Sequence, residues 1–369
     1  MGKRVLITGG AGFIGRHVAK ALLARGHEVR VLDSLVEQVH GSTQADTHWP
    51  EVEVQIGDVR DGEAVGRALI GVDAVVHLAA EVGVGQSMYE IERYVGVNEW
   101  GTAVLFQKLS ERPVELVITA SSMSIYGEGL YRTQDGAEVA DAVRPAGSMA
   151  RGWDPGDEAG RPLLPVATPE RKTPSLASVY ALNKYAQERL THIVADAYGM
   201  QGITLRLFNV YGSGQALSNP YTGVLAIFAA RLLNGKQPMV FEDGLQRRDF
   251  VHVSDVARAF ASALEAPSAA GGTFNIGSGE DVTIAQVAER LAGAMGRPDL
   301  PPRITGRARA GDIRHCFADI TRAHAALDYA PRVAFDDGLA EVVDWVARQK
   351  AVDRVDTARL ELERRGLVA

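Results

Sequence analysis

The chain has 369 residues, of which 46% are hydrophobic and 23% charged, a composition typical of a soluble globular protein of about two domains. Its 39 Lys and Arg against 46 Asp and Glu give a net charge of −7, which argues against nucleic acid or an anionic membrane as a partner. The single cysteine, Cys316, excludes an intramolecular disulfide and a multi-cysteine metal cluster. No stretch resembles a membrane span or a secretion signal, so we expect a soluble, cytoplasmic protein without a metal.

The first predicted elements are a strand, a glycine loop and an amphipathic helix. The apolar run Val5-Leu6-Ile7 leads into Thr8-Gly9-Gly10-Ala11-Gly12-Phe13-Ile14-Gly15. Glycine allows a tight turn and a close approach of the backbone to a pyrophosphate, whose charge the free N–H groups at the helix start can bind. The pattern predicts a dinucleotide site that includes Gly9, Gly12, Phe13, Ile14 and Gly15.

The second predicted strand, 28–33, ends in Asp33. A carboxylate about 20 residues beyond the glycines can bind the ribose hydroxyls of adenosine and repels a 2′-phosphate, which favours NAD over NADP. A turn aspartate without this role is the alternative. A third strand, 52–56, leads to Asp58 and Val59, and Asp58 could reach the adenine.

Two further buried strands are predicted by apolar runs at 74–80 and 114–119, with a long helix over about 86–110 between them. The first run ends in Leu78, Ala79 and Ala80, whose small side chains leave room for a cofactor. Strands that alternate with helices predict a parallel, doubly wound sheet of the Rossmann type, which binds ligands at the carboxyl ends of its strands.

Residues 128–172 lose this periodicity and are rich in Gly, Pro and charge. We interpret them as an insertion or flap near the active site, with a passive surface excursion as the alternative.

A helix is predicted over 178–198, within which Tyr180 and Lys184 lie four residues apart and so point the same way. Its buried side is expected to be apolar. The expected buried residues are Val179, Leu182, Ala186, Leu190, Ile193, Val194 and Ala197.

A sixth strand over 202–209 completes the predicted dinucleotide-binding domain, 1–212, and the chain over 250–275 is expected to return to it. Residues 213–350 form a smaller, mixed substrate domain in this interpretation. Residues 351–369 are predicted to form a weak amphipathic helix, with Val352, Val355 and Leu362 inward, that caps the fold or supports oligomerisation.

Oxidation of a secondary alcohol needs a base for the hydroxyl proton and an acceptor for the hydride. A tyrosine, with an ordinary pKa of about 10, becomes a usable base when a nearby cation stabilises its phenolate. Tyr180 and Lys184 fit these roles, and Ser122, at the end of the fifth strand, can hold the substrate oxygen.

In order and spacing, these elements resemble the extended short-chain dehydrogenases/reductases, in their nucleotide-sugar epimerase and dehydratase branch, over residues 3–350. The matching elements are 8–15, Asp33, Asp58-Val59, 77–80, Asn98, 121–127, Tyr180 with Lys184, 206–212, 248–253 and 275–277. The resemblance implies that Tyr180 is the base, that Lys184 modulates it and anchors a ribose, and that Asn98 belongs to the NAD site.

The resemblance also implies a nucleotide-diphosphate sugar as substrate, with Ser122 and Ser124 near the sugar. It places Asn209, Arg248 and Arg309 on the diphosphate, and those arginines would let an acidic protein hold an anion. It further implies a homodimer formed through the helices at 86–110 and 178–198.

Dehydratases of this branch carry an acidic pair directly after the serine, whereas this chain has Met123 and Ser124. The expected reaction is therefore 4-epimerisation. Segments 81–89, 121–131 and 165–170 most resemble the dTDP-L-rhamnose 4-epimerases, which make dTDP-6-deoxy-L-talose. A UDP-hexose 4-epimerase, an NAD(P)H-dependent 4-keto-sugar reductase and a non-catalytic NAD-sensing protein are the alternatives.

Overall fold

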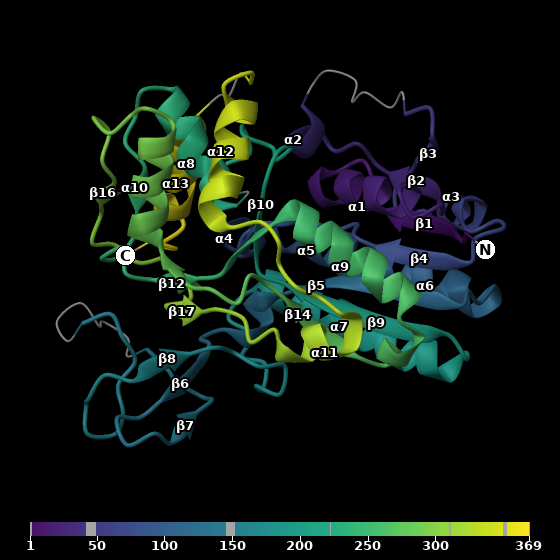
Figure 1. The fold of residues 1–369 in the computed structure, drawn as a ribbon, viewed down its shortest axis with the longest axis horizontal. Helices are drawn as coiled ribbons and strands as arrows, with labels where there is room; N and C mark the ends of the chain where they lie inside the picture. Colours follow the sequence, from purple (N-terminus) through teal and green to yellow (C-terminus); the bar gives the residue numbers. More distant parts are fainter. Residues whose placement is uncertain are drawn as a thin grey trace.

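A parallel sheet of seven strands, in the order β14-β9-β5-β4-β1-β2-β3, forms the centre of the larger part of the molecule (Figure 1). The computed structural model describes residues 2–41, 49–144, 152–221, 223–309, 311–349 and 353–368. The predicted Rossmann-type fold is confirmed. The strands are β1 (Arg4–Thr8), β2 (Glu28–Asp33), β3 (Val52–Ile56), β4 (Ala74–His77), β5 (Leu116–Ser122), β9 (Gln201–Leu207) and β14 (Thr273–Ile276).

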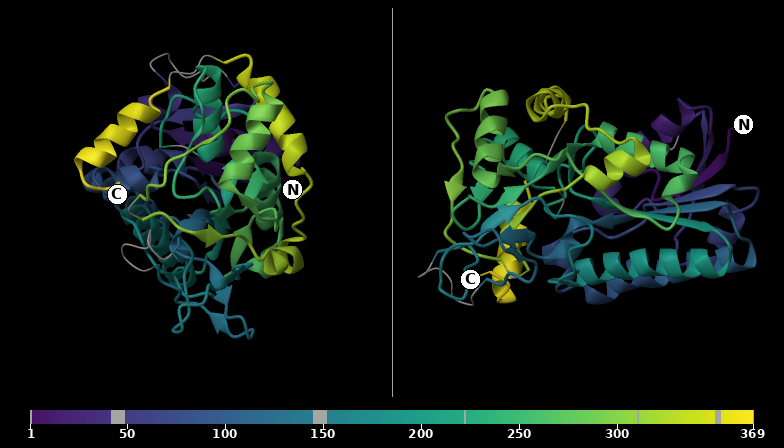
Figure 2. Two further views of the ribbon diagram at one scale, coloured as in Figure 1. Left: turned by 90° about the vertical axis from the view of Figure 1, so that its left-hand side faces the viewer. Right: turned by 60° about the horizontal axis from the view of Figure 1, so that its bottom comes forward.

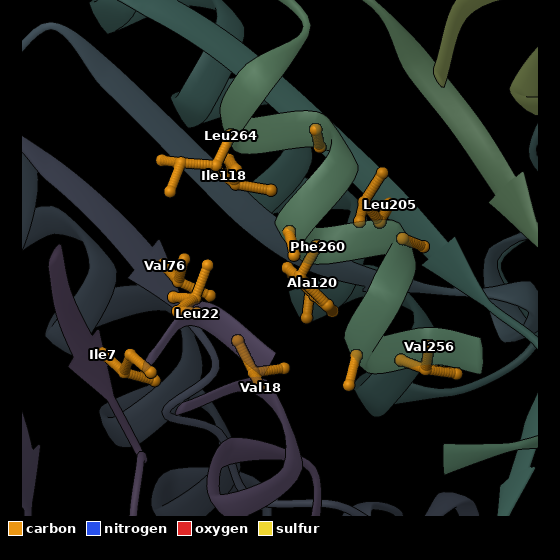
Figure 3. Close-up of a cluster of buried hydrophobic side chains, with 14 of the residues drawn as sticks. Ile7, Val18, Leu22, Val76, Ile118, Ala120, Leu205, Val256, Phe260 and Leu264 are labelled. Atoms are coloured by element: carbon orange, nitrogen blue, oxygen red, sulfur yellow. The ribbon is translucent and has the colours of Figure 1, made fainter. Parts of the chain in front are cut away.

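Helices cover both faces of this sheet, because alternate strand residues point to opposite sides and both sides are apolar. Ile7, Val76 and Ile118 face one group of helices, where Phe260 of α9 is fully buried (Figure 3). Leu6, Val75 and Val117 face the other group. The first group is α1 (Phe13–Leu23), α9 (Val253–Glu265) and α11 (Thr321–Leu327), and the second is α3 (Gly62–Ala68), α6 (Gly101–Glu111) and α7 (Val179–Ala197).

The long helix expected over about 86–110 is confirmed over its greater part. A separate turn, α4 (Val84–Ser87), precedes it, and α5 (Ile91–Val95), the π-helical η1 (Gly96–Trp100) and α6 then follow one another without a break. A Cβ on Gly101, the first residue of α6, would lie 2.6 Å from Cγ2 of Val59, so this glycine lets the helix pack closely there. In this segment Asn98 bonds the loop that follows β4.

The buried side of α7 also differs from the prediction. Leu182 and Ile193 are 48% and 56% exposed. The side that faces the sheet is polar, because partners for its side chains lie there: Glu188 pairs with Arg206 at 2.6 Å, and Thr191 bonds Thr119 at 2.7 Å. The residues buried on this side are Tyr180, Ala181, Asn183, Lys184, Gln187, Glu188, Thr191 and Ala195.

The chain between β9 and the last helices forms a second, smaller part with its own core, in which Phe228, Val287 and Leu339 are buried. The helices here are α8 (Val224–Leu233), α10 (Ile284–Ala294) and α12 (Phe335–Val346). Short sheets pair β10 (Asn209–Tyr211) with β13 (Phe250–His252), β11 (Met239–Val240) with β16 (Arg303–Ile304), and β12 (Arg247–Arg248) with β15 (Val282–Thr283) and β17 (His315–Cys316).

The chain passes back from this smaller part to the large sheet. Helix α9 packs on α1, a short turn η4 (Pro267–Ala269) follows it, and β14 pairs with β9 at the edge of the sheet. Residues 250–275 therefore lie mainly with the dinucleotide-binding part.

Residues 128–172 contain a small antiparallel sheet of β6 (Leu130–Arg132), β7 (Glu138–Val139) and β8 (Leu164–Val166) at the lower left of Figure 1. Ion pairs attach this segment to the smaller part, since Asp154 lies 2.7 Å from Arg314 and Arg144 pairs with Glu242. The structure does not describe 145–151 of the expected insertion.

The last described segment carries α13 (Val355–Arg364), beside the C-terminus in both views of Figure 2. Leu362 is buried as expected and Val355 half-buried, while Val352 lies outside the described residues. The segment is attached to α8, where Arg231 pairs with Asp353 at 3.4 Å. None of the helices in the described ranges is long and apolar enough to cross a membrane.

Candidate active site

A cavity of about 970 Å³ lies at the carboxyl ends of the sheet strands, against the smaller part of the molecule. Residues that directly follow β1, β2, β3 and β4 line one end, and the end of β5 and the start of α7 line the middle. From β1 the chain adds strands towards one edge of the sheet, β2 and then β3, and from β4 it adds them towards the other edge. The switch point between β1 and β4 is where doubly wound sheets bind their ligands.

The glycine loop leaves no room for side chains. Gly9 has a φ of +70°, and a Cβ on it would lie 2.8 Å from the backbone nitrogen of Ala79. A Cβ on Gly15 would lie 2.5 Å from Cα of Gly10. Helix α1 then begins at Phe13 without a side-chain cap, so its first N–H groups are free to bind an anion. Gly9, Gly12, Phe13, Ile14 and Gly15 all line the cavity.

Asp33 connects this loop to the end of β2. Its carboxylate accepts hydrogen bonds from the backbone N–H of Ala11 at 3.0 Å and of Leu35 at 2.9 Å, and His40, in the short helix α2 (Glu37–His40), lies 3.5 Å away. Burial raises the pKa of Asp33, but these bonds outweigh it and hold the pKa below its usual value. An ionised carboxylate therefore stands at this end of the cavity.

The other residues expected around the dinucleotide fall into two groups. Asp58, Val59, Leu78, Ala79 and Ala80 line the cavity. The carboxylate of Asp58 is bound by Arg60 at 2.6 Å, a hydrogen bond that lowers the pKa of Asp58.

Asn98 is not among the residues that line the cavity. It is fully buried, and both ends of its side-chain amide bond the backbone of Glu81, at 2.7 and 3.1 Å. Asn98 therefore positions the loop after β4, which does line the cavity.

Ser122, Ser124 and Tyr180 meet in the middle of the cavity. Ser122 caps η2 (Met123–Tyr126), and its Oγ accepts hydrogen bonds from the N–H of Ser124 at 3.1 Å and from the Ser124 hydroxyl at 2.9 Å. Burial raises the pKa of Tyr180 to about 12, although a hydrogen bond with Ser122 opposes this rise. The N–H of Tyr180 donates to Oγ of Ser87 at 3.1 Å, which fixes the start of α7 against α4.

Lys184 lines the cavity one turn further along α7. Its ammonium donates to Oε1 of Gln187 at 2.6 Å, and burial lowers the pKa of Lys184 to about 7. Nε2 of Gln187 in turn lies 2.8 Å from the Thr102 hydroxyl and 3.2 Å from Nε2 of His77. Burial lowers the pKa of His77 to about 3, so this imidazole is neutral.

Sequence reasoning missed this network around Lys184. The available signal was the position of Gln187, three residues after Lys184 on the side of the helix that carries Tyr180. The apolar residues on the opposite side of α7 favoured the wrong buried face and so hid this signal.

Asn209, Arg248 and Arg309 line the end of the cavity in the smaller part. Oδ1 of Asn209 is buried and has no hydrogen-bond partner within the described ranges. Arg248 donates to main-chain carbonyls, including that of Arg314 at 3.0 Å, and burial lowers its pKa. None of the described carboxylates forms an ion pair with Arg248, which suits it to bind an anionic ligand.

Arg309 is engaged in this structure. Its guanidinium pairs with Asp312 at 2.8 Å and lies 4.5 Å from the centre of the Phe241 ring. The cation therefore lies at the cavity wall with a carboxylate beside it.

The cover of the cavity comes from an unexpected part of the chain. None of the described residues of 128–172 lines the cavity, and this segment contacts it from outside, because Arg144 donates to the backbone carbonyl of Asp312. The segment after β4 does line it, through 81–85 and Met88. The C-terminal segment contributes Val355, Ala358, Arg359, Leu362 and Leu367.

A protein-family model described as the NAD dependent epimerase/dehydratase family matches residues 5–147 and 156–277. The chain is 35% identical to a dTDP-L-rhamnose 4-epimerase of Burkholderia thailandensis, over 94% of this chain and 96% of that protein. It is 31% identical to a UDP-glucose 4-epimerase of Mycolicibacterium smegmatis, over 93% of this chain and 98% of that protein.

Solved structures of 4-epimerases share the fold of this chain. A UDP-glucose 4-epimerase of Thermotoga maritima with UDP-glucose superposes with a TM-score of 0.76 at 30% identity, over 94% of this chain and 99% of that chain. A Thermus thermophilus UDP-glucose 4-epimerase in complex with NAD gives a TM-score of 0.74 at 32% identity, over 94% and 100% of the two chains.

Proposed function

The chain belongs to the NAD-dependent epimerase/dehydratase family, and we propose that it is a nucleotide-diphosphate-sugar 4-epimerase that inverts C4 through a transient 4-keto sugar. The observation that carries the proposal is the convergence of Tyr180, Ser122 and Lys184 on one cavity between the glycine loop and Arg248. The proposed conversion is dTDP-L-rhamnose to dTDP-6-deoxy-L-talose, supported by the 35% identity to the Burkholderia thailandensis protein.

NAD is the cofactor of this family, and the residues present fit it. The glycine loop leaves space and free N–H groups for a pyrophosphate, and Asp33 offers an ionised carboxylate to the ribose hydroxyls. When bound, NAD supplies the chemistry of accepting the C4 hydride and returning it.

Tyr180 moves the proton in the proposed reaction. Its phenolate takes the proton of the C4 hydroxyl while the C4 hydrogen leaves as a hydride, so that the C–O bond becomes a carbonyl. Tyr180 returns the same proton after the hydride has been delivered to the opposite face of the keto sugar. The proton and the hydride are both restored, and the sugar changes only its configuration at C4.

Ser122 and Lys184 assist this proton transfer. The Ser122 hydroxyl, which bonds Ser124 and Tyr180, is placed to hold the C4 oxygen. A cation at Lys184 stabilises the phenolate and brings the pKa of Tyr180 down from about 12 towards neutrality. Because the pKa of Lys184 is about 7, this cation is partly populated at neutral pH.

The substrate end of the cavity carries the diphosphate in this proposal. Arg248, which forms no ion pair with the described carboxylates, and Arg309 supply charge, and Asn209 and Ser124 supply hydrogen bonds. When the substrate binds, the ion pair between Arg309 and Asp312 breaks and Arg309 pairs with a phosphate instead.

A different reaction and a different substrate are the alternatives. Dehydration needs an acid beside Ser122, where the chain has Met123 and Ser124. UDP-glucose is the second candidate substrate, because UDP-glucose 4-epimerases are among the relatives and structural neighbours at 30–32% identity.

We also propose a homodimer. Leu182 and Ile193 of α7, together with Trp100 of η1 at 61% exposed, form an apolar surface on neighbouring helices. Pairing this surface with its counterpart on a second copy about a two-fold axis would bury it in both subunits.

The test is to incubate the purified protein with dTDP-L-rhamnose or UDP-glucose, without added cofactor, and to follow C4 of the sugar by NMR. Conversion without net formation or use of NADH supports the epimerase. No conversion of these sugars, together with NAD(P)H-dependent reduction of the matching 4-keto sugar, would instead establish a keto-sugar reductase.

A further inference from the structure

The C-terminal helix α13 lines the cavity that also contains the proposed catalytic residues. We propose that α13 is a wall of the substrate site: Ala358 and Leu362 enclose the nucleotide sugar, and Arg359 supplies a further cation to its diphosphate. This inference rests on the proposed function, since it takes a nucleotide-diphosphate sugar as the ligand.

The apolar side of α13 faces inward. Ala358 and Leu362, four residues apart on one helix face, are only 7% and 6% exposed, whereas Leu360, on the same helix, is 45% exposed. Ala358 and Leu362 both line the cavity, as do Val355 before them and Leu367 after them. A helix face that is buried at the edge of a cavity excludes water from whatever occupies it.

This wall lies close to the proposed base. A Cβ on Gly85 of α4 would lie 3.6 Å from both terminal carbons of Leu362, so the two helices are in near contact. On the same short helix α4, Oγ of Ser87 accepts the hydrogen bond from the N–H of Tyr180 at 3.1 Å. One four-residue helix therefore separates Leu362 from the start of α7.

Arg359 carries charge into the same cavity. One guanidinium nitrogen donates to Glu363 at 2.6 Å, and Asp356 lies 4.0 Å from Nε. Nε itself is buried and makes no hydrogen bond within the described part of the chain. A donor that is buried without a partner is costly, and a phosphate oxygen would satisfy it. Arg248 and Arg309 line the same cavity, so Arg359 adds a third cation to its wall.

The C-terminal segment is attached on both sides of the cavity. On the side of the smaller part, Asp353 pairs with Lys236 at 2.8 Å and Glu363 pairs with Arg307. On the side of the dinucleotide-binding part, the guanidinium of Arg365 lies 4.4 Å from the centre of the Tyr89 ring. The segment therefore spans the opening, held by contacts that are each weak at an exposed surface.

The end of the segment also reaches the residue proposed to bind phosphate. The backbone of Val368 forms an antiparallel bridge with that of Arg309. Helix α13 and Arg309 therefore belong to one connected structure, and the position of α13 affects how Arg309 meets the diphosphate.

The experiment compares two pairs of variants in the NAD-loaded protein. Leu362→Ser is matched by Leu360→Ser, and Arg359→Gln by Arg364→Gln, whose side chain is exposed on the same helix. Binding of dTDP and UDP is measured by calorimetry, KM with the converted nucleotide sugar, and NAD content by release on denaturation.

We expect Arg359→Gln to weaken binding of the diphosphate about tenfold and to reduce its dependence on salt. We expect Leu362→Ser to raise KM for the nucleotide sugar about tenfold. NAD content and both control variants should match the wild type. If each variant binds and turns over as its control does, or if all losses follow a loss of NAD or of thermal stability, α13 is not a wall of the substrate site.

The wild-type protein separates this inference from the proposed function. If it binds neither dTDP nor UDP, both fail. If it binds one of them but does not change C4 of any nucleotide sugar, the proposed function fails while Arg359→Gln still tests the wall. If it epimerises normally and the variants do not differ from their controls, only the inference about α13 fails.

Discussion

The ammonium nitrogen of Lys184 lies 2.6 Å from Oε1 of Gln187, three residues further along α7. Burial removes the ammonium from water and lowers the pKa of Lys184 to about 7. The amide of Gln187 stabilises the cation without adding a negative charge, and it is itself held by Thr102 and His77. Lys184 is thereby kept near the midpoint of its titration at neutral pH.

This pair predicts opposite effects of two substitutions at residue 187. Gln187→Leu removes the hydrogen-bond acceptor, so the pKa of Lys184 should fall by about 1–2 units, since a hydrogen bond to a charged group contributes about 1.5–3 kcal/mol. Gln187→Glu adds a carboxylate and should raise it. The measurement is the pH at which kcat declines on the alkaline side. Equal values in both variants would show that Gln187 does not set the charge of Lys184.

The burial of Lys184 also predicts a dependence of stability on pH. Its folded pKa of about 7 lies below the ordinary lysine value of 10.5, so between these values the unfolded chain binds more protons. The stability penalty of burying Lys184 is therefore full below pH 7 and is lost as the pH rises towards 10.5. Lys184→Met lacks this penalty. Its free energy of unfolding in urea should therefore exceed that of the wild type at pH 6.5, and this difference should shrink by pH 9. A constant difference would contradict the lowered pKa.

Asp33 predicts the choice of dinucleotide. Its carboxylate is ionised and lies where the adenosine ribose is expected, so it should repel a 2′-phosphate. Asp33→Asn should improve binding of NADP relative to NAD about tenfold, equivalent to about 1.4 kcal/mol. The measurement is titration of the protein stripped of its cofactor. Asp58→Asn is the control, because Arg60 neutralises Asp58. An unchanged ratio in Asp33→Asn, or an equal change in the control, would contradict this role.

The exposed side of α7 predicts how the subunits associate. Ile193→Asp should convert the proposed dimer to a monomer, because it would bury a carboxylate without a partner in the interface. Leu164→Asp, at a residue 47% exposed in the 128–172 segment, is the matched control and should remain dimeric. Light scattering after size-exclusion chromatography gives the mass. A wild-type monomer, or a dimeric Ile193→Asp, would overturn the proposed interface.

The parts of the fold that could be predicted from sequence are those governed by local rules. The glycine loop and the alternation of strands and helices depend on residues close together in the chain. These signals were sufficient for the parallel sheet and for the glycine loop, Ser122, Tyr180 and Lys184, all of which line one cavity.

The errors arose where distant residues decide the outcome. The polar side of α7 is buried because Arg206 and Thr119 supply partners, and neither is visible in the periodicity of the helix. The position of α13 depends on ion pairs between Asp353 and residues more than 100 positions earlier.

The most direct test of the account is to follow C4 of dTDP-L-rhamnose by NMR in D₂O, with purified protein and no added cofactor. The hydride never exchanges with solvent, so the 6-deoxy-L-talose product should carry protium at C4, with no net change in NADH. Tyr180→Phe should lower the rate about 10²–10⁴-fold while NAD stays bound, because only the proton acceptor is lost. Deuterium at C4, stoichiometric formation of NADH, or undiminished activity of Tyr180→Phe would contradict the account.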